Sequence, residues 1–253
     1  MSKFLTIAKR AARAGASQAL KYYEANVEVK LKKDRTPVTV ADTEAEKVII
    51  ETIRSQFPEH AFFGEESGRS GRQSNYVWII DPIDGTKNFI AGIPLWGTLI
   101  ALMHRDEVIV GVSYLPVMNE MLVAEKGSGT WLNSKRVTVS DRSRLRDSML
   151  SFGSLGPFAE KDKKRGLESL IAACKRHRCF GDCWPYHLLV AGKLEIVVEA
   201  AIKLVDVAPF VCIIKEAGGK SSDINGKPLH PEIDSFIATN GKLHRATMKH
   251  LDK

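Results

Sequence analysis

A chain of 253 residues, 44% of them hydrophobic and 26% charged, can bury a substantial core, and this composition excludes an intrinsically disordered protein. Its formal net charge of +7 favours anionic partners in general. The densest basic runs, Lys161–Arg165 and Lys175–Arg178, contain few aromatic residues, so they indicate solvated faces of a helical segment and not a nucleic-acid groove.

Residues 1–26 carry apolar side chains at helical spacing and predict an amphipathic helix. They lack the apolar core of a signal peptide, and no apolar run elsewhere approaches the length of a membrane span. We therefore expect a cytoplasmic protein with no membrane partner.

A second helix is predicted from Ala41 or Asp42 to about Phe57, with Asp42 or Thr43 as its cap and Pro58 just beyond its end. Short β-rich runs separated by turn residues follow. These predicted strands are Tyr76–Ile80, Trp96–Met103, Val108–Leu115 and Met121–Glu125.

The second half of the chain mixes both types of element. Strands are predicted at Ser148–Phe152 and Glu195–Glu199, and helices at Lys163–Lys175, Trp184–Ala191 and Asp206–Ala217. Together the two halves predict a layered α/β protein with a sheet in each half. The strand runs are too irregularly spaced for a repeated βαβ barrel.

The four cysteines form no CxxC pair, so we interpret them as reduced packing thiols. The alternative is a zinc site that also uses His177 and His187. The cysteines are Cys174, Cys179, Cys183 and Cys212.

The segment WIIDPIDGTKNF, Trp78–Phe89, places two carboxylates, Asp81 and Asp84, at the end of an apolar strand. Pro82 keeps Asp81 extended, and Gly85 permits a sharp turn whose exposed backbone amides can bind an anion such as phosphate. Carboxylates held together near an anion repel it and each other unless a cation lies between them. Mg²⁺ suits such a site best, because it prefers oxygen ligands and phosphate oxygens can complete its octahedron.

Further acidic residues occur in GEES, Gly64–Ser67, at Asp42 on the second helix, and at Asp206 in VDVAP. Each of them alone is better explained as a helix cap or a surface residue. The combination of GEES, DPIDGT and a late VDVAP…EAGG indicates a shared site.

These motifs, from Thr36 through Gly219 and in the same order, resemble the inositol monophosphatase superfamily of magnesium-dependent, lithium-sensitive phosphatases. The resemblance implies an αβαβα sandwich of the inositol monophosphatase and fructose-1,6-bisphosphatase type, usually a homodimer. It also implies a single catalytic domain over residues 1–253, with a metal-binding lobe at about 1–145 and an α/β lobe at about 146–253.

Carried over position by position, the resemblance implies two or three Mg²⁺ ions. The first would bind Glu65, Asp81 and the carbonyl of Ile83; the second would bind Asp81, Asp84 and Asp206; a third would lean on Glu65 and water. Thr86 and Asp42 would orient and deprotonate the attacking water, while the amides of Gly85 and Thr86 would grip the phosphate. One departure is Val205, where the family commonly has an aromatic residue.

The segments Lys32–Asp42, Phe89–Leu102 and Gly181–Leu204 look most like the histidinol-phosphatase branch of the superfamily. Asp182 would then face the leaving group, and its carboxylate suits the cationic amine and imidazole of histidinol better than a neutral polyol. Glu199 aligns with a position that contacts substrate hydroxyls in the inositol enzymes, and it could equally bind an ammonium group. For Asp182 the alternative is a plain turn residue.

The leading interpretation is therefore a Mg²⁺-dependent phosphatase acting on L-histidinol phosphate in histidine biosynthesis. Inositol 1-phosphate, or a broad range of sugar and nucleotide monophosphates, is the nearest alternative. A more remote alternative is an RNA- or protein-binding factor on the same fold. The complete set of acidic residues argues for an enzyme.

Overall fold

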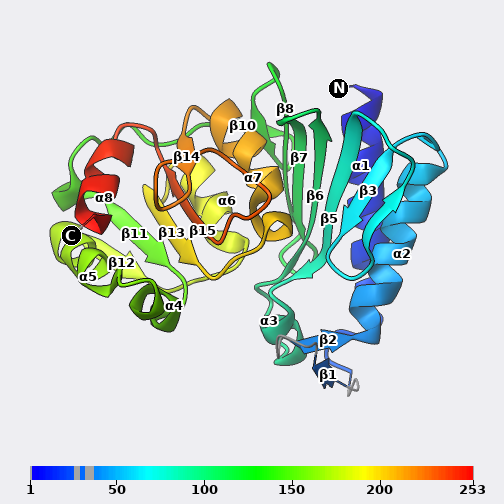
Figure 1. Cartoon of the computed structure of the whole chain (residues 1–253), viewed down its shortest axis with the longest axis horizontal. Helices are drawn as coiled ribbons and strands as arrows, with labels where there is room; N and C mark the ends of the chain where they lie inside the picture. Colours follow the sequence, from blue (N-terminus) through cyan, green and yellow to red (C-terminus); the bar gives the residue numbers. More distant parts are fainter. Residues whose placement is uncertain (1, 26–28, 32–36, 253) are drawn as a thin grey trace.

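Helices and sheets alternate in five layers, αβαβα, as the resemblance implied (Figure 1). The structure is a computed structural model that describes residues 2–25, 29–31 and 37–252. Thr36, where the resemblance begins, thus lies outside the described residues, as do Lys32–Arg35. Within the described part of the chain, no helix is both long enough and apolar enough to cross a bilayer.

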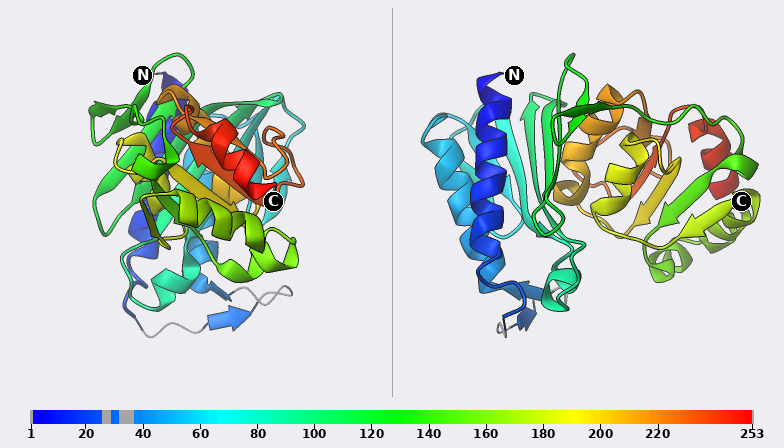
Figure 2. Two further views of the ribbon diagram at one scale, coloured as in Figure 1. Left: turned by 90° about the vertical axis from the view of Figure 1, so that its left-hand side faces the viewer. Right: turned by 180° about the vertical axis from the view of Figure 1, so that it is seen from behind.

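The first layer consists of α1 (Lys3–Ala19) and α2 (Val40–Arg54), which lie side by side on the outer face of the larger sheet (Figure 2). The amphipathic first helix is confirmed, although it ends at Ala19 and turns follow it. Small buried residues on α1 let the two helices approach closely. These are Ala8, Ala11, Ala12, Gly15 and Ala16.

The start of α2 differs from the prediction. Its N-cap is Thr39, whose hydroxyl accepts a hydrogen bond from Ala41 N at 3.1 Å, and not Asp42 or Thr43. Asp42 lies three residues further on and accepts from Thr39 N at 2.7 Å, completing a capping box. The carboxylate of Asp42 is therefore inside the first turn of the helix.

The second layer is an eight-stranded sheet in the order β10-β9-β8-β7-β6-β5-β3-β4. All neighbouring strands pair antiparallel except β3 and β5, which are parallel. The four strands predicted in this half are confirmed as β5 to β8. The bounds are β3 Ala61–Gly64, β4 Gly68–Gly71, β5 Tyr76–Asp84, β6 Gly97–His104, β7 Glu107–Leu115, β8 Glu120–Glu125, β9 Thr130–Leu132 and β10 Lys135–Val137.

Strand β5 is buried on both faces of this sheet. Trp78 and Ile80 pack against α1 and α2, whereas Ile79 points to the opposite side and joins the core around the central helices. The strand continues beyond the predicted end at Ile80 to Asp84, with an irregularity in its pairing with β6 between Asp81 and Asp84. Both carboxylates are therefore mounted on the strand itself.

The central layer contains α6 (Trp184–Val190) and α7 (Leu204–Glu216), which lie between the two sheets. Their apolar residues form one core with side chains from both sheets, including Ile79 and Val197. Helix α7 begins at Leu204, so Asp206 is at its third position and is not its N-cap.

The fourth layer is a five-stranded sheet in the order β12-β11-β13-β15-β14, and α4, α5 and α8 cover its outer face (Figure 1). The basic run at Arg176–Arg178 is an exposed edge strand and not a helix face, so that part of the prediction was wrong. The bounds are β11 Met149–Phe152, β12 Arg176–Arg178, β13 Ile196–Ala200, β14 Lys220–Ser222, β15 Ser235–Thr239, α4 Leu155–Glu160, α5 Lys164–Ala173 and α8 His244–Leu251.

Three short elements complete the description. A two-stranded sheet pairs β1 (Val29–Leu31) with β2 (Pro37–Thr39). Helix α3 (Thr86–Ile90) follows β5 directly, and a 3₁₀ turn spans Leu145–Asp147.

Candidate active site

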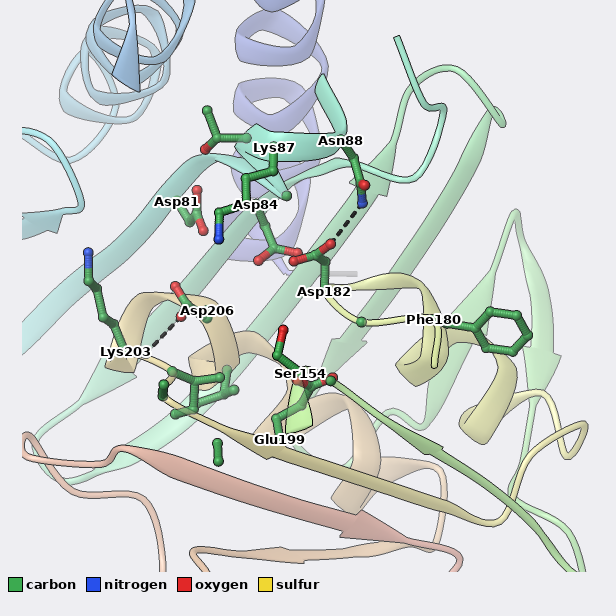
Figure 3. A pocket seen from close by; sticks show the side chains of 18 of the residues that line it. Asp81, Asp84, Lys87, Asn88, Ser154, Phe180, Asp182, Glu199, Lys203 and Asp206 are labelled. Carbon is green, nitrogen blue, oxygen red and sulfur yellow. Dashed lines mark hydrogen bonds between the residues drawn. The ribbon is translucent and has the colours of Figure 1, made fainter. Parts of the chain in front are cut away.

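A cavity of about 480 Å³ opens where the end of β5 meets the start of α7 and the loop before α6 (Figure 3). Its walls come from both halves of the chain. Of the residues proposed from the sequence, it is lined by Glu65, Asp81, Ile83, Asp84, Gly85, Thr86, Asp182, Glu199 and Asp206. The tenth, Asp42, is buried at the start of α2.

Three aspartates gather in this cavity. Asp81 and Asp84 come from β5 and Asp206 from the first turn of α7, yet each offers a carboxylate oxygen within 4.8 Å of the others. Asp81 is 2% and Asp84 8% exposed, so water does not screen them fully. Within the described residues this is the one such group of three or more acidic, histidine or cysteine side chains.

Burial and, after it, mutual repulsion raise the pKa values of these three aspartates. Burial, followed by the charges of Glu65 and Asp84, raises the pKa of Asp81 well above its usual range. Burial likewise raises the pKa of Asp84, with Asp182 and Asp206 adding to it. The pKa of Asp206 is raised to about 7, again chiefly by burial.

Such a donor set fits a hard divalent cation. All three side chains offer oxygen, which is the ligand that Mg²⁺ and related ions prefer, and a cation between them would remove the repulsion that raises their pKa values. The zinc alternative with histidine does not fit, because His187 is buried elsewhere and shares a hydrogen bond with Ser113 Oγ at 2.8 Å. All four cysteines are free thiols.

Glu65 follows β3 and lies beside the three aspartates. Its backbone N–H donates to the carbonyl of Ile80 at 3.0 Å, which holds the residue against β5. Its carboxylate raises the pKa of Asp81 and lies 3.5 Å from Nζ of Lys203. Glu65 is thus positioned as the fourth acidic side chain of the site.

Thr86 and Asp42 approach the site from different elements. The hydroxyl of Thr86 donates to the carbonyl of Ile83 at 3.1 Å, so the residue is anchored to the bend between Asp81 and Asp84. Asp42 accepts from the hydroxyl of Thr39 at 2.7 Å, and its charge also raises the pKa of Asp81.

Gly85 makes the turn from β5 into α3. Its φ of 84° and ψ of 39° are left-handed, a conformation that favours glycine. A Cβ at this position would lie 3.0 Å from the carbonyl oxygen of Leu95 and 3.4 Å from the carboxylate of Asp182. Glycine is therefore favoured by the left-handed turn and by the close approach of the Leu95 carbonyl, and the Asp182 carboxylate packs directly against the same position.

Asp182 and Glu199 line the side of the cavity away from Asp81 (Figure 3). Asp182 has a φ of 51° and accepts a hydrogen bond from Asn88 Nδ2 at 2.8 Å. Glu199 projects from β13; burial raises its pKa to about 8, with Asp182 and Asp206 adding to the shift. Its Oε1 is buried and has no hydrogen-bond partner among the described residues.

Among the cavity residues that were not proposed as site residues from the sequence are Lys87, Asn88 and Lys203. Lys87 and Asn88 directly follow DPIDGT, so the motif itself was a signal for them. Lys203 lies three residues before Asp206, and its backbone N–H donates to that carboxylate at 2.7 Å. The two lysines bring positive charge to an otherwise acidic cavity (Figure 3).

The chain is similar to known proteins in both sequence and structure. The profile described as the inositol monophosphatase family matches residues 1–253. The histidinol-phosphatase of Streptomyces coelicolor is 33% identical over 237 residues, covering 90% of this chain and 88% of that protein. The inositol-1-monophosphatase of Mesorhizobium japonicum is 32% identical over 258 residues, covering 100% and 97%. The crystal structure of the extragenic suppressor protein suhB from Bartonella henselae superposes with a TM-score of 0.93 at 30% identity, covering 100% and 99%.

Proposed function

The chain belongs to the inositol monophosphatase family and is a phosphomonoester hydrolase, and we propose that it uses Mg²⁺ to hydrolyse L-histidinol phosphate. The observation that carries the proposal is the group of three aspartates, Asp81, Asp84 and Asp206, of which the first two are buried. They line a cavity in which Oε1 of Glu199 has no hydrogen-bond partner among the described residues and could accept from a cationic substrate.

The residues that would hold Mg²⁺ are Glu65, Asp81, Asp84, Asp206 and the carbonyl of Ile83. Bound Mg²⁺ would supply a water of lowered pKa and positive charge opposite the leaving oxygen. The protein itself holds the ligand oxygens of Asp81 and Asp84 close together, because both residues lie on the buried strand β5.

Water and phosphate are handled by the turn that follows β5. Thr86, anchored to Ile83, orients the attacking water, and Asp42 takes its proton. The amides of Gly85 and Thr86, in the left-handed turn between β5 and α3, would bind the phosphate. The lysines at positions 87 and 203 attract the anionic ester into the cavity.

The choice of histidinol phosphate rests on Asp182 and Glu199. A cationic amine or imidazolium needs a buried acceptor, and Oε1 of Glu199 is one without a partner among the described residues. A bound cation would favour the ionised form of Glu199, whose pKa is raised to about 8 by burial when no cation is present. A neutral polyol could donate a hydroxyl hydrogen bond to Oε1, but it would bring no positive charge to favour the ionised form.

The proposal extends to properties that follow from the family resemblance. The protein is proposed to act in the cytoplasm in histidine biosynthesis, as a homodimer that is inhibited by lithium and binds two or three Mg²⁺ ions. The division into a lobe at about 1–145 and a lobe at about 146–253 belongs to the same proposal.

The alternative substrates are inositol 1-phosphate and a broad set of sugar or nucleotide monophosphates. Release of inorganic phosphate from histidinol phosphate and from inositol 1-phosphate, measured side by side with Mg²⁺, separates them. We expect the larger kcat/KM with histidinol phosphate. Hydrolysis of inositol 1-phosphate alone would reject histidinol phosphate as the substrate and leave the phosphatase assignment standing.

The remote alternative is an RNA- or protein-binding factor on the same fold. The similarity to a protein named as an extragenic suppressor, suhB, is the reason to consider it. A chain that only binds RNA or protein does not need every residue of the catalytic site. This chain retains Asp42, Glu65, Asp81, Asp84, Thr86 and Asp206. Their joint retention favours the enzyme.

A further inference from the structure

We propose that Glu46 is a positioning residue, whose buried carboxylate fixes the turn that carries Glu65. This inference rests on the proposed function, because the assignment of Glu65 as a metal ligand belongs to it. Glu46 itself does not line the cavity.

The carboxylate of Glu46 accepts two hydrogen bonds from consecutive backbone amides. Oε2 accepts from Glu66 N at 2.9 Å, and Oε1 accepts from Ser67 N at 2.9 Å. Glu46 is only 2% exposed, so the accepting carboxylate is shielded from water although the turn itself is partly exposed. An ionised carboxylate suits this arrangement, since both of its oxygens face donors.

Gly64 permits this contact. A Cβ on Gly64 would lie 2.5 Å from the carboxylate of Glu46, closer than any side chain could come without displacing it. Glycine at the end of β3 therefore lets the turn close over Glu46. The residue between Gly64 and the two bonded amides is Glu65.

Glu65 is consequently held from two sides. On one side its own N–H donates to Ile80 of β5 at 3.0 Å. On the other side, Glu46 holds the next two amides of the turn. A long acidic side chain on a turn would otherwise sample many positions, and the ordering cost of bringing it to a metal would weaken binding.

Helix α2 thereby serves the site at two successive turns. Asp42 and Glu46 are four residues apart, so they share one face of the helix, and both are buried. Asp42 meets the end of β2 and Glu46 meets the Glu65 turn. The helix is a common support for both groups.

The test is Glu46→Gln, with Glu51→Gln as the matched control. Glutamine has the same shape, but its NH₂ group would face one of the two amide N–H donors. Glu51 lies on the same helix and is exposed, so its substitution changes the charge of α2 without touching the turn. Mg²⁺ titrations of phosphate release, together with calorimetric Mg²⁺ binding without substrate, measure the effect.

For Glu46→Gln we expect the Mg²⁺ concentration at half-maximal activity, and the calorimetric Kd, to rise on the order of 10- to 100-fold. At saturating Mg²⁺, kcat should return close to the wild-type value, because Glu46 takes no part in the chemistry. Glu51→Gln should leave both quantities unchanged. A folded Glu46→Gln protein with wild-type Mg²⁺ affinity would overturn the proposal.

Hydrogen exchange of the metal-free protein gives a readout that needs no activity. The amides of Glu66 and Ser67 should be protected in the wild type and exchange faster in Glu46→Gln, while the amides of β5 keep their protection. Rapid exchange of both amides in the wild type would contradict the proposal. If the glutamine variant fails to fold, Glu46→Asp keeps the charge with a shorter reach and should show an intermediate loss of Mg²⁺ affinity; an unchanged affinity would again count against it.

Failure of the proposed function would look different. A wild-type protein that releases no phosphate from any ester with Mg²⁺ would reject the phosphatase mechanism. Equal Mg²⁺ dependence of an active wild type and Glu46→Gln would reject only the positioning of Glu65.

Discussion

Asn88 and Asp182, which are 94 residues apart in the chain, are joined by a hydrogen bond of 2.8 Å from Nδ2 of the amide to Oδ2 of the carboxylate. Asn88 belongs to α3, directly after the carboxylates of β5, and Asp182 belongs to the loop before α6 (Figure 3). The part of the cavity assigned to metal and the part assigned to substrate recognition are thus physically connected.

Asp182→Asn tests whether that carboxylate recognises a cation. An asparagine can still accept the bond from Asn88 through its amide oxygen, so the loop should keep its position, but the negative charge is lost. A charged hydrogen bond contributes about 1.5–3 kcal/mol, so kcat/KM for histidinol phosphate should fall by on the order of 10- to 100-fold. For inositol 1-phosphate we expect a change within about 3-fold, since a neutral polyol gains little from the charge.

Equal losses of kcat/KM for the two esters would show that Asp182 does not recognise the cationic substrate. Asn88→Ala is the companion variant, because it removes the hydrogen bond and keeps the charge. It should affect both esters to a similar extent.

Asp84→Asn should abolish hydrolysis without unfolding the protein. The variant loses a ligand oxygen charge, and removal of groups even one shell further from a metal costs on the order of 10- to 100-fold, so we expect at least that loss in kcat. Burial and neighbouring acids raise the pKa of Asp84, so removing its charge relieves repulsion, and the metal-free Tm should stay equal or rise. Normal turnover would show that the metal assignment is wrong; Asp106→Asn, at an exposed turn, is the control.

Without metal, the protein should lose stability as pH rises from about 6.5 to 8. Burial raises the folded-state pKa of Glu199 to about 8 and of Asp206 to about 7, above their ordinary values of 4.5 and 3.8. In this range the folded state holds protons that the unfolded state has released, so higher pH favours unfolding. Below pH 6.5 the buried His187 and His244, whose pKa values are lowered by burial, act in the opposite direction.

Thermal melts in the presence of a chelator between pH 6.5 and 8 measure this slope. Glu199→Gln should make it shallower, because glutamine does not titrate. A Tm that rises through this range in the wild type would contradict the assigned shifts.

Gly85→Ala should cost more than a positive φ alone explains. Gly127 also has a positive φ of 78° but has no heavy atom within 4 Å of the position that a Cβ would occupy, so Gly127→Ala measures backbone strain by itself. Gly85→Ala adds crowding against Leu95 and Asp182. We expect about 1 kcal/mol of destabilisation for Gly127→Ala and about 2–3 kcal/mol for Gly85→Ala.

Urea denaturation measures both free energies, and kcat/KM for histidinol phosphate gives the second readout. It should fall only for Gly85→Ala, since only that alanine crowds the turn that lies beside Asp182. Identical losses of stability and activity for the two variants would show that the approach of Asp182 to Gly85 is unimportant.

The layered architecture could be predicted because each long element carried its own periodicity. The buried strands from Tyr76 to Glu125 were located to within a few residues, and α7 was recognised by its apolar run and following glycines. Boundaries were less accurate where side-chain hydrogen bonds decide them. Thr39 caps α2 because its hydroxyl accepts from Ala41 N, and its own N–H and hydroxyl donate to the carboxylate of Asp42; two acceptable caps nearby concealed it.

Edge strands and supporting residues escaped prediction for a physical reason. Strand β12 is a short, exposed basic segment that is held in place by pairing with β11, so no apolar pattern marks it. Glu46 resembles any polar residue on a helix until the Glu65 turn is folded against it. Lys203 could not be singled out either, because its Nζ lies 3.5 Å from Oε1 of Glu65, a residue far away in the sequence.

The most direct test of the metal site is a crystal structure of the protein grown with Mn²⁺ in place of Mg²⁺ and with inorganic phosphate. Mn²⁺ accepts the same oxygen ligands and is located by its anomalous scattering. The proposed metal site predicts at least one anomalous peak between the carboxylates of Asp81, Asp84 and Asp206, with phosphate oxygens beside it at the turn of Gly85 and Thr86. A metal bound elsewhere, with these three carboxylates left without one at saturating Mn²⁺, would contradict it.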